Sequence, residues 1–340
     1  MTETNVATRG RSGSRNSRIA LVVFGVAALA LLAWVTGWWE SHHTIFAQVM
    51  VSGLLIGSVY SLVSMGLSLV FGVLDIINFA HGALMSVAMY VAFVLARSYG
   101  VDPYLSLLVT IPLMFIIGVF VQATIINPVM DAPLHSQLLL TLGLSLFIQN
   151  LLLVLFTGTP RSIELPYASG SLGLGLVTLD FPFRLFGAVV TLPKAIAFIV
   201  SLLLAGALFL LLQRTRLGTA IRAAAQDPEG AELVGIDVRR VYLVTFGIGA
   251  ASVGAAGSLI LPFFFVSPTA GETFNIIAFV VVVLGGMGSI RGALAGGFLI
   301  GLTQELTQLF VPGSSKLIGV FALFILVLLL RPEGLFGSRT

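Results

Sequence analysis

The side chains of this sequence that could do chemistry are polar groups set within or beside long apolar runs. They are Asp75, Asn78, His81, Gln122, Gln149, Asn150, Asn275, Gln304, Glu305 and Gln308. Polar groups at membrane depth are unfavourable unless they face partners or water, so each of them is a candidate for lining a path across a membrane. The alternative for each is a hydrogen bond between helices or a position at the membrane interface.

No residue spacing in the sequence is typical of an enzyme. The chain has no cysteine, which excludes disulfides, thiolate metal sites and cysteine nucleophiles. Its four histidines form no HExxH-like pair, and the Walker A, GxSxG and GxGxxG patterns do not occur. We therefore expect a non-catalytic protein that holds no cofactor or metal of its own.

The elements that position these polar groups are predicted to be membrane helices. Hydrophobic residues make up 58% of the chain and charged residues only 9%, whereas charged residues make up about a quarter of a soluble protein. In lipid the backbone must satisfy its own hydrogen bonds, so each crossing needs about 20 apolar residues in a helix. The apolar runs do not alternate in polarity as the strands of a membrane barrel do. The sequence therefore predicts an all-α integral membrane protein, a polytopic helical bundle.

We expect about ten membrane segments, some of them broken or re-entrant. They cover residues 19–39, 45–73, 82–96, 105–126, 137–157, 195–212, 241–266, 276–288, 293–311 and 317–330. Segment 45–73 is long and interrupted by glycines, whereas 82–96 and 276–288 are short. Broken or partial helices are tolerated at membrane depth only where protein or a water-filled path covers the backbone. Residues 1–18 are expected to be a disordered basic cytoplasmic tail, and residues 19–340 one transmembrane domain.

The basic residues predict how the chain is oriented. If all segments cross and the amino terminus is cytoplasmic, 12 of the 17 basic residues lie inside. If 276–288 is re-entrant, Arg291, Arg331 and Arg339 move outside and Lys316 moves inside, so that only ten basic residues lie inside. The positive-inside rule favours ten crossings. The net charge of +3 is then explained by basic residues on the cytoplasmic side of the membrane and does not indicate nucleic-acid binding.

A polar stretch of about 25 residues follows residue 213 and predicts a short helix-turn-helix outside the membrane. Residues 215–226 favour a helix, Asp227 and Pro228 end it and begin the next, and Gly235 ends the second helix. Four alanines give a small-residue surface that a partner protein can approach closely: Ala220, Ala223, Ala224 and Ala225. The alternative interpretations are a solvated loop and basic residues that hold lipid headgroups.

Two junctions in the sequence resemble each other, NFAHGALM from Asn78 and GSIRGALAG from Gly288. Each offers a side chain that can cap a helix, Asn78 or Ser289, then a basic residue and the sequence Gly-Ala-Leu at the start of an apolar helix. The match predicts a weak internal duplication, and a chance match of small residues is the alternative.

Three blocks of the sequence resemble the permease subunits of ABC importers for branched-chain amino acids. They are GLLIGSVYSLVSMGLSLVFGVLDIINFAHGALM from Gly53, RLGTAIRAAAQDPEGAELVGIDVRR from Arg216 and VVVVLGGMGSIRGALAGGFLIGL from Val280. The wider family includes ribose-type sugar permeases and urea or short-amide permeases, and the resemblance covers nearly all of residues 48–336. The sequence INFAHG, residues 77–82, is similar to that of one of the two paralogous permeases that pair in these importers.

The resemblance implies an ABC importer transmembrane-domain fold in the bacterial inner membrane. Its implied partners are a homologous second permease, cytoplasmic ATPase subunits that bind the ATP and magnesium, a periplasmic or lipid-anchored solute-binding protein, and membrane lipid, with no nucleic acid. The implied solute is a branched-chain or related amino acid. The alternatives are urea, a short amide or another small solute and, in a different class, a secondary transporter or channel that is not coupled to an ATPase.

The resemblance also assigns residues. It implies an ATPase-docking loop at residues 213–240, whose matching positions are Arg216, Gly218, Arg222, Ala223, Asp227, Ala231, Leu233, Gly235 and Ile236, with Ala224 added from the alanine surface. It implies a pore-associated motif, and the candidates for the path are therefore Asn78, His81, Gly82, Gln149, Asn150 and Gln304. Ala83 and Arg291 depart from the family pattern, in which a polar residue and a proline are common at these positions.

Overall fold

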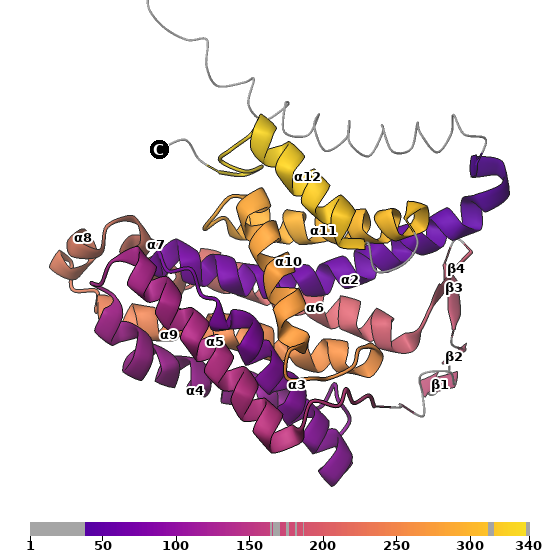
Figure 1. Cartoon of the computed structure of the whole chain (residues 1–340), viewed down its shortest axis with the longest axis horizontal. Helices are drawn as coiled ribbons and strands as arrows, with labels where there is room; N and C mark the ends of the chain where they lie inside the picture. The colour runs from indigo at the N-terminus through magenta and orange to yellow at the C-terminus, as the bar shows by residue number, and fades with distance from the viewer. Residues whose placement is uncertain are drawn as a thin grey trace, which may run out of the picture.

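The computed structural model describes residues 38–163, 165, 171–174, 177–180, 182–185, 187–311 and 316–337. The predicted tail at 1–18 lies outside these residues, and so does the predicted span at 19–39 except for its last two residues. The described part of the chain is built mainly from helices that pack into one bundle (Figure 1).

The α-helices of this part are α2 (Trp38–Leu74), α3 (Ala80–Tyr99), α4 (Leu107–Val121), α5 (Leu134–Phe156), α6 (Leu192–Arg214), α7 (Arg216–Gln226), α8 (Pro228–Leu233), α9 (Val238–Ile260), α10 (Ala270–Gly285), α11 (Ile290–Phe310) and α12 (Lys316–Leu330). Short helices of other types are η1 (Gln122–Ile126), η2 (Asn127–Val129) and η3 (Leu261–Phe263). Between α5 and α6 lie two antiparallel hairpins, β1 (Ser171–Leu174) with β2 (Val177–Asp180) and β3 (Phe183–Leu185) with β4 (Ala188–Val190).

Six helical stretches of the described chain are long and apolar enough to cross a membrane: Thr44–Leu74, Ala80–Tyr99, Leu107–Val129, Leu134–Phe156, Leu192–Arg214 and Val238–Phe263. α10 and α12 are apolar but hold 16 and 15 residues, fewer than the roughly 20 that a straight crossing needs. α11 has 21 residues, with the polar sequence TQELTQ in its second half. The predicted bundle of membrane helices is confirmed, whereas the predicted ten segments are not.

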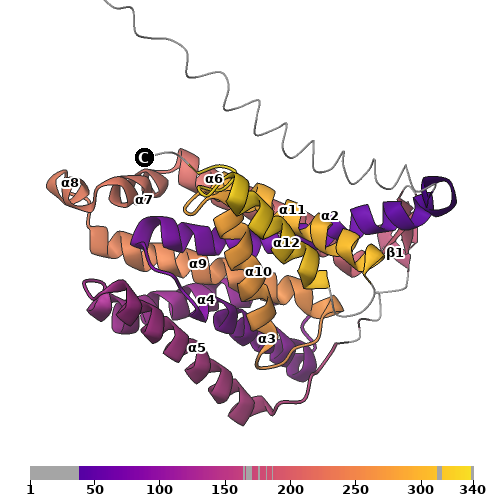
Figure 2. The ribbon, with the colours of Figure 1, turned by 45° about the horizontal axis from the view of Figure 1, so that its top comes forward.

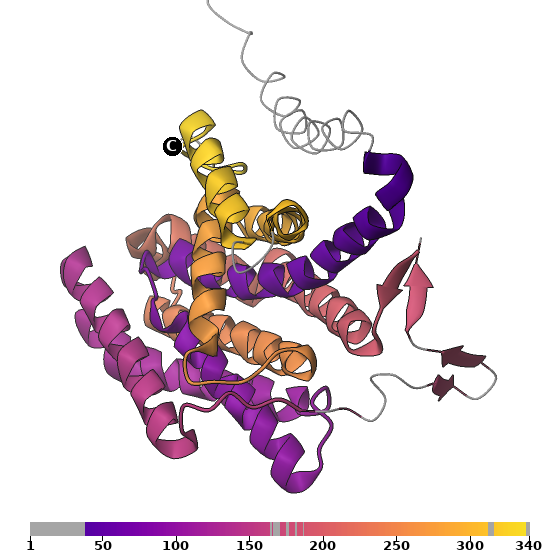
Figure 3. The same cartoon turned by 45° about the vertical axis from the view of Figure 1, so that its right-hand side comes forward.

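α2 is the central helix, and it packs against α6, α9, α10 and α11. Figure 1 shows it running through the middle of the bundle, with α11 and α12 on one side and α3, α4, α5 and α9 on the other, and in the turned view of Figure 2 α11 and α12 pass in front of it. Most of α2 and α9 is buried, whereas only about a third or less of α4, α5 and α6 is buried. The hairpins lie at the end of the bundle away from α7 and α8 (Figures 1 and 3).

Small residues bring α2 and α11 together. A Cβ built at Gly53 would lie 2.9 Å from the Cα of Leu302, and one at Gly57 would lie 3.0 Å from the Cα of Phe298. These glycines therefore serve close helix packing. The expected break within segment 45–73 is wrong, because α2 is continuous through these positions.

The two segments that were expected to be short also differ from the expectation. The segment predicted at 82–96 is the 20-residue helix α3, long enough to cross. The segment predicted at 276–288 is α10, which begins earlier, at Ala270, and ends where Gly286 takes a φ of 98°. A positive φ favours glycine and is a common way to end a helix.

Candidate functional site

The chain between α2 and α3 turns back into the bundle as a non-helical segment (Figure 1). At the end of α2, Asp75 has a φ of 54°, which non-glycine residues rarely adopt. α3 then begins beside the middle of α2, because His81 donates from Nε2 to the carbonyl O of Val63 at 3.1 Å. Val63 lies about 16 Å along the helix axis from the end of α2, at 1.5 Å per residue. Residues 75–79 therefore span much of that depth as non-helical chain, after the last helical hydrogen bond from the N–H of Asp75 to the carbonyl O of Phe71.

Side chains of neighbouring helices form hydrogen bonds with this non-helical backbone. Thr141 of α5 donates its hydroxyl to the carbonyl O of Ile77 at 3.1 Å. Asn275 of α10 donates its amide to the carbonyl O of Phe79 at 3.1 Å, and its own oxygen accepts from the N–H of Gly82 at 3.2 Å. Non-helical backbone at membrane depth is tolerated only where protein or a water-lined path supplies such partners.

α3 and α10 cross at two glycines. A Cβ at Gly82 would collide with the carbonyl O of Gly271, and a Cβ at Gly271 would collide with the carbonyl O of Gly82. Beside the crossing, Ser86 accepts from the N–H of Gly271 at 2.9 Å. Gly82 is therefore needed for the helix contact itself, which brings Asn275 within reach of the start of α3.

Gln304 belongs to the same central region, although it comes from α11. Its side-chain oxygen accepts from the hydroxyl of Tyr60 on α2 at 2.9 Å. Tyr60 lies one turn from Val63, and its ring centroid is 6.0 Å from that of Phe274, the neighbour of Asn275 in α10. The buried candidates Asn78, His81, Gly82 and Gln304 thus gather around the middle of α2. We call these four residues, with Tyr60 and Asn275, the polar centre.

The two candidates on α5 do not join the polar centre. Gln149 donates to the hydroxyl of Ser145 on its own helix at 3.1 Å. Asn150 is exposed and donates to the carbonyl O of Leu146, also on its own helix, at 2.7 Å. Its neighbours on that face are exposed apolar side chains such as Phe147. Of the six candidates for the path, the structure therefore brings four together.

Sequence reasoning missed several polar residues of α2. Tyr60 is one of them, and Ser64 and Ser68 are two others. The buried hydroxyls of Ser64 and Ser68 have no hydrogen-bond partner within the described structure. Serines at positions 61, 64 and 68 recur at three- and four-residue spacing, so they share one face of α2. That spacing in the sequence could have found them.

The two similar junctions share part of their geometry. The side-chain oxygen of Asn78 accepts from the N–H of Ala80 at 3.0 Å, and that of Ser289 accepts from the N–H of Gly292 at 3.1 Å. The glycine of each Gly-Ala-Leu packs on a glycine of α10: Gly82 on Gly271 and Gly292 on Gly285. α10 is therefore held at both ends by the same kind of contact, while the duplication itself stays a prediction.

The polar stretch after residue 213 forms the predicted pair of short helices. Thr215 caps α7 by accepting from the N–H of Gly218 at 3.1 Å, and Asp227 caps α8 by accepting from the N–H of Gly230 at 3.0 Å. Pro228 occupies the first turn of α8, where its missing N–H is not needed. Gly235, with a φ of 86°, follows the end of α8. The predicted helix starts and stops are confirmed.

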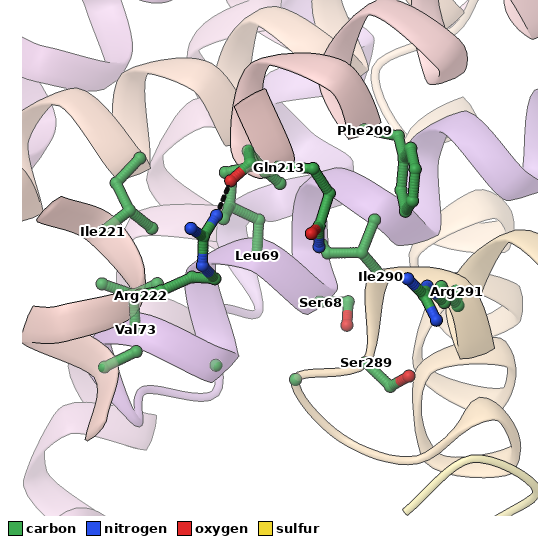
Figure 4. A pocket seen from close by; sticks show the side chains of 14 residues that line it. Ser68, Leu69, Val73, Phe209, Gln213, Ile221, Arg222, Ser289, Ile290 and Arg291 are labelled. Carbon is green, nitrogen blue, oxygen red and sulfur yellow. Dashed lines mark hydrogen bonds between the residues drawn. The ribbon is translucent and has the colours of Figure 1, made fainter. Parts of the chain in front are cut away.

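α7 is fixed to the end of α6 by two contacts. Gly218 packs so closely that a Cβ there would collide with the carbonyl oxygens of Leu211 and Leu212. Arg222 donates to the carbonyl O of Leu212, as the dashed line in Figure 4 marks. A displacement of α7 would therefore act directly on α6.

The expected alanine surface is wrong for Ala224. Its side chain is fully buried and faces the bundle together with Ile221, and in α8 Ala231 is also buried. These residues hold the helix pair in place, so a partner cannot touch them. The side chains of the pair that do reach solvent include Arg216, Arg222, Ala225 and Asp227.

The most exposed apolar side chains of the pair are at its tip. Leu233 is 89% exposed and Val234 is 76% exposed, on a segment outside the six apolar stretches. These two neighbouring side chains are therefore candidates for a contact with a partner protein or with the membrane surface. Leu233 was among the predicted docking residues, whereas Val234 was missed.

Comparison with known proteins gives concordant matches. The family model described as branched-chain amino acid transport system, permease component, matches residues 49–330. The high-affinity branched-chain amino acid transport system permease protein LivH of Escherichia coli K12 is 34% identical over 301 residues, covering 86% of this chain and 96% of LivH. BraD, the protein of the same description in Pseudomonas aeruginosa, is 32% identical over 314 residues, covering 88% of this chain and 97% of BraD. LivM of Escherichia coli K12 is 28% identical over 293 residues, covering 82% of this chain and 67% of LivM. No solved structure matches the chain significantly.

Proposed function

This chain belongs to the family of branched-chain amino acid transport permease components, and from that premise we propose how it acts as the permease subunit of a branched-chain amino acid ABC importer. The observation that carries the proposal is one continuous match over residues 49–330, which includes the polar centre and the α7–α8 pair. The identity to this chain and the coverage are both higher for LivH than for LivM. This agrees with the prediction, based on the sequence INFAHG, that the chain resembles one of the two paralogous permeases more than the other.

The polar centre is our candidate for the translocation path. Non-helical backbone at residues 75–79, held by side chains of α5 and α10, supports this choice because such backbone is tolerated at membrane depth only beside protein or a water-filled path. A homologous permease would supply the other half of the path. The exposed apolar faces of α4, α5 and α6 are available for that partner or for lipid.

The α7–α8 pair is our candidate for the ATPase contact. ATP and magnesium would bind to the partner ATPases, so this subunit would need no catalytic group of its own. Leu233 and Val234 would enter a groove of the ATPase, and closure of the ATPase pair would push on α7. The contacts of Gly218 and Arg222 would pass that push to α6, which packs on α2.

We propose a branched-chain amino acid as the solute, recognised mainly by a periplasmic or lipid-anchored binding protein. The printed descriptions of LivH and BraD support this solute class. The subunit would lie in the bacterial inner membrane, with its amino terminus and the α7–α8 pair on the cytoplasmic side.

The test is to tag the chain, extract it gently from its native membrane and identify the proteins that come with it. The complex is then reconstituted with its binding protein, and ATP-driven uptake of radiolabelled leucine, urea and fructose is compared. We expect an ATPase and a homologous permease to co-purify, and leucine to be taken up.

The two readouts separate the parts of the proposal. Uptake of urea or fructose without leucine would contradict the solute but not the importer. A chain that purifies alone and transports without an ATPase would contradict the importer, and would favour a secondary transporter or channel.

A further inference from the structure

A pocket of about 260 Å³ lies where α7 meets the ends of α2, α6 and α11 (Figure 4). Its polar lining comes from four elements: Ser68, Gln213, Arg222, Ser289 and Arg291. α2 and α6 are long enough to cross a membrane, whereas α7 is not. The pocket therefore lies at the level where spanning helices leave the membrane.

The pocket is rich in positive charge that has no carboxylate partner. No aspartate or glutamate lines it, and within the described residues neither Arg222 nor Arg291 forms an ion pair. Arg291 stacks over the ring of Phe209 at 5.6 Å, a contact that leaves its N–H groups available. A guanidinium has five N–H donors, and the contacts of Arg222 to Leu212 and Thr219 do not use all of them.

A buried hydroxyl gives independent evidence for a ligand. The side chain of Ser68 is fully buried, it lines the pocket, and its Oγ has no hydrogen-bond partner within the described structure. In Figure 4 its oxygen points into the space between Arg222 and Ser289. Native proteins rarely leave such a group unpaired. The N-terminus of the 21-residue helix α11, capped by Ser289, adds a partial positive charge at the same place.

The chemistry of the lining selects the ligand. A zwitterionic amino acid would leave its ammonium group without a carboxylate partner, so an anion fits better. Two guanidinium groups, hydroxyls and a helix N-terminus are the donors that bind phosphate. Leu69, Val73 and Ile221 supply an apolar wall beside them, which suits the glycerol and first acyl carbons of a lipid better than a free ion.

We propose that this pocket binds the phosphate of an anionic phospholipid headgroup and so joins α7, α6 and α11 through a lipid. Arg291, which lines the pocket and whose N–H groups stay available beside Phe209, is the residue on which the site would depend most. The proposal rests on the proposed function only in that α7 lies at the cytoplasmic membrane surface.

The experiment uses the complete permease complex in nanodiscs of phosphatidylcholine with and without phosphatidylglycerol. Native mass spectrometry counts the phosphatidylglycerol that stays bound, for the wild type, Arg291→Gln and the control Arg239→Gln. Arg239 is exposed on α9 and does not line the pocket. We expect Arg291→Gln to lower retention by about fivefold, which is the effect of one arginine near an anionic surface, and Arg239→Gln to leave it unchanged.

A second arm separates a lipid phosphate from a free phosphate. Phosphatidylglycerol should raise the melting temperature of the wild-type complex and raise it less for Arg291→Gln, since a ligand stabilises the state that it binds. Inorganic phosphate and glycerol 3-phosphate at millimolar concentration should not reproduce this. Equal retention by the wild type and Arg291→Gln would overturn the site, and full protection by inorganic phosphate would overturn the lipid. Leucine uptake, measured separately, reports on the proposed function.

Discussion

Asn275 is the side chain that joins the start of α3 to α10. Both ends of its amide are used by backbone groups, the N–H of Gly82 and the carbonyl O of Phe79. Because Asn275 is buried, loss of its amide would leave these groups unpaired away from water. At the scale of single residues, the polar centre is thus held by hydrogen bonds to backbone more than by contacts between side chains.

Asn275→Ala should therefore destabilise the subunit. Each buried group left unpaired costs about 1–3 kcal/mol, so the melting temperature of the purified permease should fall by several degrees. Asn150→Ala is the matched control, because Asn150 is exposed and bonds only to its own helix; it should change stability by less than about 0.5 kcal/mol. Equal melting temperatures for Asn275→Ala and Asn150→Ala would show that the Asn275 bonds do not form.

His81→Ala should lower leucine uptake at normal expression. The imidazole ties the first turn of α3 to the carbonyl O of Val63, in the middle of α2. Without it, the non-helical segment at residues 75–79 would lose the contact that fixes its depth. His135→Ala, at an exposed position near the start of α5, is the control and should transport normally. Unchanged uptake by His81→Ala would remove His81 from the path and leave it a structural role only.

At the scale of elements, the α7–α8 pair has an inner face that fixes it and an outer tip that is free. Ile221 and Ala224 are buried against the bundle, whereas Leu233 and Val234 are exposed. Stability and docking are therefore assigned to different residues of one short segment. Variants can test the two roles separately.

Leu233→Asp should weaken recovery of the ATPase with the tagged permease. A charge would replace an exposed apolar side chain that we place at the centre of the contact, and such residues typically contribute enough for a fall in affinity of about tenfold or more. The neighbouring exposed Glu232→Gln is the control, and it should bind normally. Normal recovery with Leu233→Asp would place the ATPase contact elsewhere.

Gly218→Val should uncouple the subunit without removing the ATPase. The added side chain would collide with the end of α6 and push α7 away from it. Gly206→Val places the same side chain on α6 in open space and is the control. We expect Gly218→Val to keep ATP hydrolysis but to lose uptake. Uptake equal to that of Gly206→Val would show that α7 does not act through α6.

The elements differ in how far the sequence could predict them. The break between α7 and α8 and the end of α8 could be predicted because Asp227 and Gly235 act on backbone within three residues of themselves, whereas the cap of α7 by Thr215 was not predicted. The glycines of α2 were misjudged, since a glycine in a sequence is equally compatible with a break and with a close helix contact. The return of residues 75–79 depends on Asn275, almost 200 residues away, and no local pattern could reveal it.

At the scale of the whole molecule, the structure places Arg291 and Arg222 in the same pocket, hence at the same end of the bundle. The opposite end holds the chain after α3, because the hydroxyl of Tyr104 donates to the carbonyl O of Pro193 at the start of α6 at 2.8 Å. This arrangement agrees with the topology in which Arg291 lies inside. A re-entrant segment would instead have put Arg291 and α7 on opposite sides.

Cysteine labelling can decide this topology, because the chain has no cysteine of its own. Gln226→Cys and Met287→Cys should react with a membrane-impermeant maleimide only in inverted vesicles, since both positions are exposed near the α7 end. Tyr99→Cys, exposed at the far end of α3, should react only in right-side-out vesicles. Labelling of Met287→Cys on the same side as Tyr99→Cys would mean that α10 does not carry the chain across. The lipid pocket would then lose its basis, because it requires Arg291, α7 and the end of α2 to meet on one side of the membrane.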